Sequence, residues 1–303
     1  MKPILYILYF IVLTAVVTGP SDSMAQSRLP EIKFKDLEKK EPADTSGYDE
    51  RPYFLLIGQS EESLADNDYE AAGLRLVEAM AIEPDNPLNV ALLSNLGMIY
   101  YYNEQDSLAL VTLDEAIRRS PRLVGAYENR ARVLIGMNRD REAKADYQTI
   151  IELDSLNVDA RFMHGMMSLY GGNLDRAEAD FAVLKRIVPL WNKTKLAYAT
   201  MYSMTNRNLE AISLFRELID REKLPEYYSP FVGCLIAVDN LDEASKVLGE
   251  AIKMFPDDPE LYYWRAMINH KRYMPEDAHA DARRAISLGA NPAKVNDIFK
   301  DKP

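Results

Sequence analysis

The chain has 303 residues, of which 48% are hydrophobic and 27% are charged, a balance that is typical of a folded soluble protein. Acidic residues outnumber basic residues by 47 to 36, and no run of Lys and Arg is long enough to neutralise several phosphates. This composition argues against nucleic acid as a partner. The single cysteine, Cys234, excludes an internal disulfide, so the stability of the fold has to come from packing.

The N-terminus has the features of a cleaved export signal. Lys2 is followed by a mostly apolar run over residues 4–17, and Ser23-Met24-Ala25 has small residues where a signal peptidase reads them. These fourteen residues form about 21 Å of helix, less than the roughly 30 Å of a bilayer core. We therefore expect removal of residues 1–25, a mature start at Gln26, no membrane span after cleavage, and a periplasmic or secreted location. No cysteine follows the apolar run, so a lipoprotein is not expected.

Residues 26–52 differ in composition from the rest of the chain. Charged residues are dense from Lys33 to Lys40, and proline, serine and glycine follow, a combination that is typical of a flexible leader. The alternative is a tether, since Ile32, Phe34 and Leu37 are apolar side chains able to dock on the folded body or on a partner.

From residue 53 onward the chain repeats itself. The clearest copy has apolar and small residues at fixed offsets and closes on a proline: Leu93, Leu96, Gly97, Tyr100, Ala109, Leu113, Ala116 and Pro121. Seven copies close at intervals of 33 to 37 residues, at Pro84, Pro121, Ser155, Pro189, Lys223, Pro256 and Ala290. This pattern resembles the tetratricopeptide repeat, with Leu in place of its usual leading Trp and of its usual second-helix Phe.

Each copy contains two stretches with 3.6-residue apolar periodicity around a polar turn, which predicts a helical hairpin. Gly171-Gly172-Asn173 and Asp239-Asn240 are two such turns. Small residues such as Gly97, Ala109 and Ala116 are expected to let helices approach closely, with Tyr100, Phe181 and Phe215 filling gaps between hairpins. The resemblance implies an all-α fold, a right-handed superhelical solenoid of about seven hairpins over residues 53–292. The expected repeats cover about 53–86, 90–123, 124–157, 158–191, 192–224, 225–258 and 259–292.

Residues 293–303 are predicted to cap the C-terminal end of the array. Pro292 can begin a short helix with Val295, Ile298 and Phe299 on its inner face and Lys294 on its outer face.

The sequence offers little catalytic chemistry. His164, His270 and His279 are too far apart in repeat number to form an obvious ligand set, so no metal site and no cofactor are expected. Cys234 falls within a first helix, where a buried and unreactive thiol is expected. Gly171-Gly172 lies in a turn between helices and lacks the Lys of a phosphate-binding loop. Because repeats occupy nearly all of the mature chain, we expect a protein that is not an enzyme.

The resemblance also implies a binding surface, because the first helices of such repeats line a concave groove that holds a peptide or a helix of a partner protein. The expected groove residues are Met and aromatic side chains: Met98, Tyr101, Tyr102, Phe162, Met166, Tyr170, Tyr263, Trp264 and Met267. Some of them could instead pack between hairpins. One subfamily of such proteins binds the C-terminal carboxylate of chaperones with Lys, Asn and Arg residues on three consecutive first helices. That arrangement is not expected here, because only Asn95 matches it. The favoured function is a protein-binding adaptor with no evident small-molecule substrate, and the alternative is a scaffold subunit of a cell-envelope or secretion assembly.

Overall fold

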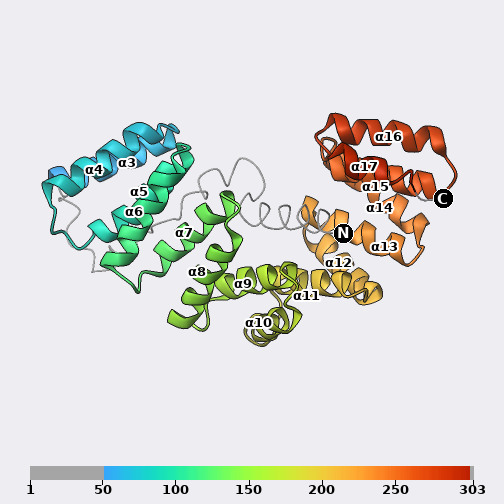
Figure 1. Cartoon of the computed structure of the whole chain (residues 1–303), viewed down its shortest axis with the longest axis horizontal. Coiled ribbons are helices and arrows are strands. Elements are labelled where there is room, and N and C mark those ends of the chain that lie inside the picture. Colours follow the sequence, from blue (N-terminus) through green and yellow to red (C-terminus); the bar gives the residue numbers. More distant parts are fainter. Residues whose placement is uncertain (1–50, 301–303) are drawn as a thin grey trace. The chain divides into compact units, whose positions relative to one another are not determined.

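The computed structural model describes residues 51–300, so the expected export signal and most of the expected leader lie outside the described residues. The described part of the chain contains fifteen α-helices and no strand, which confirms the all-α prediction (Figure 1). It divides into an N-terminal unit that ends at Met167 and a C-terminal unit that begins at Ser168. The boundary between the two units falls inside one helix.

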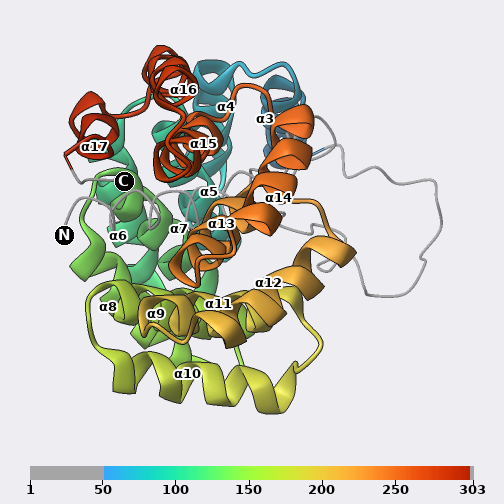
Figure 2. The same cartoon turned by 90° about the vertical axis from the view of Figure 1, so that its right-hand side faces the viewer.

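The helices follow one another at short intervals. The N-terminal unit holds α3 (Pro52–Ala65), α4 (Tyr69–Ile82), α5 (Asn89–Tyr102), α6 (Asp106–Arg119), α7 (Val124–Gly136), α8 (Asp140–Leu153) and most of α9 (Val158–Tyr170). The C-terminal unit holds the end of α9, α10 (Leu174–Ile187), α11 (Asn192–Met204), α12 (Asn208–Arg221), α13 (Pro225–Ala237), α14 (Leu241–Met254), α15 (Pro259–Lys271), α16 (Pro275–Ser287) and α17 (Pro292–Asp297). Within each unit, successive helices pack as antiparallel hairpins (Figure 2).

The two helices of each hairpin are joined by three residues, and the middle residue has a positive φ of 59° to 80°. These middle residues are Asn67, Glu104, Asn138, Gly172, Asn206, Asp239 and Tyr273. The residue that follows donates its amide to a carbonyl five positions back, as from Gln105 N to Tyr100 O at 2.8 Å, which closes the end of the first helix. Five of the seven middle residues are Gly, Asn or Asp, which tolerate this conformation best. The turns predicted around Gly172 and Asp239 are confirmed.

Small residues set the closest helix contacts. A β-carbon on Gly97 would lie 2.5 Å from Leu113 Cγ, so only glycine lets α5 approach α6 this closely. Ala109 and Ala116 on α6 are fully buried. In the C-terminal unit, Phe181 and Phe215 are fully buried as well. The predicted division between small contact residues and gap-filling aromatics is confirmed.

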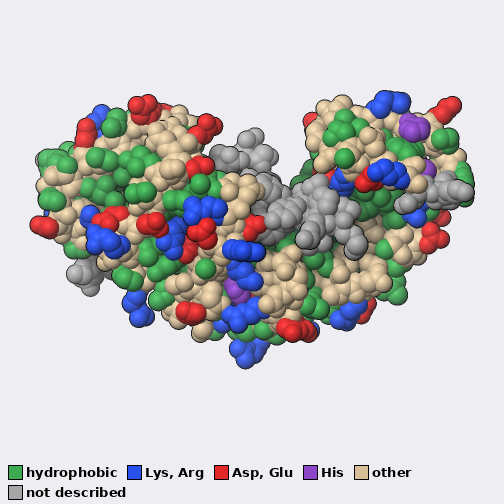
Figure 3. Space-filling view, in the orientation of Figure 1, with side chains coloured by type: hydrophobic (Ala, Val, Ile, Leu, Met, Phe, Trp, Pro, Cys, Tyr) green, Lys and Arg blue, Asp and Glu red, His purple; other side chains and the backbone are tan. Residues whose placement is uncertain are grey.

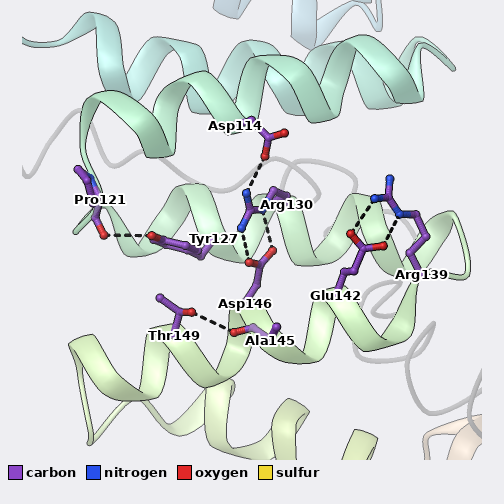
Figure 4. Close-up of polar contacts among 9 residues, drawn as sticks. All are labelled: Asp114, Pro121, Tyr127, Arg130, Arg139, Glu142, Ala145, Asp146 and Thr149. Atoms are coloured by element: carbon purple, nitrogen blue, oxygen red, sulfur yellow. Dashed lines mark hydrogen bonds and ion pairs between the residues drawn. The ribbon is translucent and has the colours of Figure 1, made fainter.

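A partly buried arginine joins three helices in the N-terminal unit (Figure 4). Arg130 on α7 donates to both carboxylate oxygens of Asp146 on α8, at 3.0 and 2.6 Å, and to Asp114 on α6 at 2.6 Å. The C-terminal unit repeats this arrangement between Arg265 on α15 and Asp281 on α16, at 2.9 and 2.6 Å. Because a planar guanidinium binds a carboxylate in a fixed orientation, each pair fixes how the two helices of its hairpin are aligned.

Helix α17 packs against α16, and Val295 and Ile298 are buried in a cluster that includes Tyr263 of α15. The expectation that Lys294 points outward is wrong. Its ammonium lies 2.7 Å from a carboxylate oxygen of Glu260 and 4.3 Å from the centre of the Tyr263 ring, and both charged side chains are only 10% exposed. The buried carboxylate and the aromatic face attract the ammonium inward, while the apolar stem of the lysine fills space beside them.

Candidate partner-binding surface

The predicted binding residues lie on first helices, which contact one another within each unit. Helix α5 contacts α7 in the N-terminal unit, and α13 contacts both α11 and α15 in the C-terminal unit. A surface that runs across neighbouring first helices therefore exists in each unit.

Tyr101 on α5 lies against Gly136, the last residue of α7. A β-carbon at position 136 would overlap the Tyr101 hydroxyl oxygen and would stand 2.9 Å from the ring carbon Cζ. Tyr102 and Tyr170 occupy the equivalent positions of the preceding and following repeats, 34 residues away on either side. At this position of the repeat, the sequence therefore has glycine where both neighbouring repeats have tyrosine, and that difference indicated the contact.

The environment of Tyr101 is partly desolvated. Burial raises the pKa of its hydroxyl, the Asp106 carboxylate raises it further, and the Arg132 guanidinium lowers it. The hydroxyl therefore stays protonated at neutral pH and can donate a hydrogen bond to a partner.

Tyr102 extends the aromatic surface toward α4. Its ring stacks on Tyr69 with centroids 5.7 Å apart, and its distance to the Tyr101 ring is also 5.7 Å. All three tyrosines are half-buried, so each offers part of its ring to a partner. Tyr69 is a second-helix residue, and a search confined to first helices misses it.

Four of the nine expected groove residues have almost no accessible side chain. Met98 is fully buried among Ala109, Leu113 and Val133, and Phe162 and Met166 are fully buried too. Tyr263 is 6% exposed and contacts the edge of Trp264 at 5.1 Å between centroids. These four side chains have no surface for a partner to cover, so their contribution is to packing.

Trp264 and Met267 on α15 remain half-buried. The indole N–H of Trp264 donates to Ser229 Oγ on α13 at 2.6 Å, and its ring passes 3.3 Å from the place where a β-carbon on Gly233 would stand. Two contacts with α13 therefore fix the orientation of this ring. Tyr170, at the end of α9, is half-buried as well, and burial raises the pKa of its hydroxyl.

Two polar groups beside the tyrosines add to this surface. The side-chain oxygen of Asn95 on α5 is buried, and no described residue donates a hydrogen bond to it. Arg132 on α7 donates to Asn129 Oδ1 at 3.4 Å, and its charge acts to lower the pKa of the Glu128 carboxyl group, which burial raises. A buried acceptor that lacks a donor and a guanidinium group with several N–H donors are both able to bind groups of a partner. The sequence placed Asn95 on the right face, but only packing shows that its oxygen lacks a donor.

Comparison with known proteins decides the family. Residues 128–190 and 235–293 match the family model described as tetratricopeptide repeat. The crystal structure of a tetratricopeptide repeat protein from Parabacteroides merdae ATCC 43184 aligns with a TM-score of 0.70 and 25% identity, over 82% of this chain and 98% of that chain. The chain is a tetratricopeptide repeat (TPR) protein. The expected solenoid of helical hairpins is thereby confirmed.

Two further proteins resemble this TPR protein. PilW, described as a widely conserved type IV pilus biogenesis factor, aligns with a TM-score of 0.58 and 18% identity, over 70% of this chain and 97% of PilW. A DnaJ homolog subfamily C member 7 homolog from Schizosaccharomyces pombe is 24% identical over 209 residues, which are 66% of this chain. The matched region spans 39% of the length of that relative.

Other chemistry in the TPR array is limited. Cys234 is 1% exposed, and burial raises the pKa of its thiol, so the prediction of a buried cysteine is confirmed. Within residues 51–300, no three His, Cys, Asp or Glu side chains gather where they could hold a metal ion. None of the helices in that range is long and apolar enough to cross a bilayer.

Proposed function

We propose that this TPR protein is an exported adaptor that binds a segment of another polypeptide on the faces of its first helices. The proposed contact residues are the accessible members of the predicted set: Tyr101, Tyr102, Tyr170, Trp264 and Met267. Asn95 and Arg132 provide polar recognition beside Tyr101. A non-catalytic role, and export with cleavage before Gln26, belong to the same proposal.

The observation that carries this proposal is the fixed position of half-exposed aromatic rings. Tyr101 is held over Gly136, and Trp264 is held by Ser229 and passes close to Gly233. Rings that are already ordered lose little conformational freedom when a partner binds, so more of their contact energy appears as affinity. Aromatic anchors of this kind commonly contribute roughly 2 kcal/mol or more each to binding.

The alternative is a scaffold subunit of a cell-envelope or secretion assembly. Large exposed apolar side chains, such as Leu74 at 57% and Val111 at 65%, favour it, since such surface is often covered in a permanent complex. An adaptor purified alone should be monomeric, whereas a scaffold subunit should self-associate. Light scattering coupled to gel filtration distinguishes the two.

The adaptor proposal is tested by capturing partners from the native envelope fraction and identifying them by mass spectrometry. Tyr101→Ala with Tyr102→Ala, and Trp264→Ala with Met267→Ala, should reduce capture at least tenfold, since two anchors are removed in each case. The matched control is Lys246→Ala, an exposed residue on the second helix α14. Circular dichroism should show the same helix content for all variants. Undiminished capture by both double variants would exclude these faces as the binding surface.

Buried members of the original set provide a second control. Phe162→Ala with Met166→Ala should lower stability by several kcal/mol, because each truncation leaves a cavity. If a variant captures less partner and also loses helical content, the loss of capture is due to impaired packing and not to a lost contact with the partner.

A further inference from the structure

Large apolar side chains are exposed together on the second helices of the first two hairpins. Leu74 and Val77 on α4, and Leu108 and Val111 on α6, are 43% to 65% exposed. We call these four residues the α4/α6 patch. Figure 3 shows hydrophobic side chains gathered over this part of the N-terminal unit. The patch lies on second helices and is separate from the first-helix surface proposed above.

The repeat fold itself does not require this patch. The equivalents of Val111 in the next four repeats are small or charged residues, Ala145, Ala179, Ser213 and Lys246. The equivalents of Leu108 in the next three repeats are charged residues, Glu142, Arg176 and Glu210. Since exposed positions of the same architecture accept polar residues elsewhere, the apolar residues on α4 and α6 have a role other than folding.

The patch also lies in the most acidic part of the chain. Residues 52–120 contain twelve acidic and three basic residues, a formal charge of −9, while the whole chain has −11. On α4 itself, Glu70 and Glu78 flank the apolar side chains, and Glu78 is paired with Arg75 at 2.7 Å. A segment that covers the patch should therefore combine apolar side chains with positive charge.

The chain contains one segment with this composition next to the patch in sequence. Residues 28–40 carry five basic and three acidic residues, and Ile32, Phe34 and Leu37 are interleaved with lysines. These residues lie outside the described part of the chain. We propose that residues 28–40 of this chain bind the α4/α6 patch, with the three apolar side chains against α4 and α6 and the lysines near the acidic residues.

The connection is long enough for this contact. Eleven residues lie between Lys40 and the start of α3 at Pro52, and an extended chain of that length spans roughly 40 Å. A helix of 14 residues, such as α4, is about 21 Å long. The segment can therefore reach any part of the patch from its attachment point.

The open end of the first hairpin is a poorer site for this segment. Gln59 and Glu62 on α3 are exposed at repeat positions where the next hairpin buries Leu96 and Ile99. Leu55 on the same helix is 51% exposed, at the position where the next hairpin buries Leu92, so this end is polar only in part. The α4/α6 patch is the larger apolar surface, with four exposed side chains.

Zero-length coupling of amines to carboxylates in the mature, full chain tests the contact directly. Cross-links within one molecule should join Lys33 or Lys35 to Glu70, Glu78 or Asp114. They should be lost in a variant with Ile32→Ser, Phe34→Ser and Leu37→Ser, which keeps every charge. Cross-links that map only to other hairpins, or only between two molecules, would overturn the proposal.

Hydrogen exchange of residues 28–40 gives an independent readout. Exchange in the wild type should be about tenfold slower than in a Leu74→Ser, Val111→Ser variant, because docking protects the amides. The matched control is Leu209→Ser, which changes a leucine on α12 that is 71% exposed and should leave the protection intact. These substitutions at exposed sites should leave the melting temperature nearly unchanged. Equal exchange in the wild type and the patch variant would refute the docking, whether or not the first-helix surface binds a partner.

Discussion

The hydroxyl group of Tyr101 on α5 lies where the side chain of any residue but glycine would begin at position 136 of α7. Because Gly136 has no β-carbon, the Tyr101 ring of α5 can pack directly against α7. The first prediction tests this contact.

Gly136→Ala should displace the Tyr101 ring and reduce partner capture about tenfold, as expected for losing one aromatic anchor. Thermal stability should change little, since the higher helix propensity of alanine, about 1 kcal/mol, offsets the cost of moving the ring. Gly125→Ala is the control, because no atom lies within 4 Å of its added β-carbon. Equal capture by both variants would show that the position of Tyr101 does not matter for binding.

Ala109→Leu and Ala244→Leu should each lower the free energy of unfolding by about 1 to 3 kcal/mol. Both alanines are fully buried on second helices, so the larger side chain has to push helices apart. Ser107→Leu and Lys246→Leu place the same side chain at exposed positions of the same helices and serve as controls. Urea denaturation measures the difference, and unchanged midpoints for both alanine variants would contradict the packing.

Glu104→Asn should stabilise the protein. Glu104 has a φ of 59° in the turn between α5 and α6, a conformation that costs an ordinary residue roughly 1 kcal/mol and that asparagine adopts more readily. A gain of about 0.5 to 1 kcal/mol should raise the melting temperature by about 1 to 4 °C. Glu104→Ala removes the same charge without favouring the turn, so a similar rise in that variant would assign the effect to charge.

Stability should fall steeply above pH 10, and Tyr263 should account for part of the fall. Burial raises the pKa of its hydroxyl to about 12, from an ordinary value of 10. Between these values the unfolded chain loses the proton and the folded protein keeps it, so unfolding becomes easier as pH rises, by up to about 1.4 kcal/mol per pH unit. Tyr263→Phe should reduce this slope. Denaturation curves at pH 9, 10 and 11 measure it, and identical slopes would contradict the burial.

The proposed export predicts the residue at which the mature chain begins. Intact mass of the protein recovered from its native host should correspond to a chain that begins at Gln26, because the apolar run is short and Ser23-Met24-Ala25 suits cleavage. A full-length product held in the membrane would instead indicate an uncleaved anchor.

Much of the architecture could be predicted from the sequence because it depends on local rules that repeat. Gly97 and Ala109 occupy positions of the repeat at which two helices come into close contact. Gly172 and Asp239 occupy the turn position that needs a positive φ. In each case one residue type satisfies one steric requirement, so spacing alone is informative.

The set of accessible aromatic and methionine side chains could be predicted only in part. Met98 and Tyr101 are one helical turn apart on α5 and look alike in sequence, yet Met98 is fully buried and Tyr101 is half-exposed. The difference arises from α6 and α7, where Leu113 and Val133 cover the methionine while Gly136 leaves room for the tyrosine.

The sequence by itself therefore determined the repeat, the hairpins and their turns, because these depend on residue type and spacing within a short stretch of chain. Only the tertiary structure decided which aromatic rings stay accessible, that Lys294 turns inward to Glu260, and that Arg130 joins three helices. Each of these outcomes depends on the shape and charge that a neighbouring helix presents, and a periodic pattern records the position of that neighbour but not how its side chains fit together.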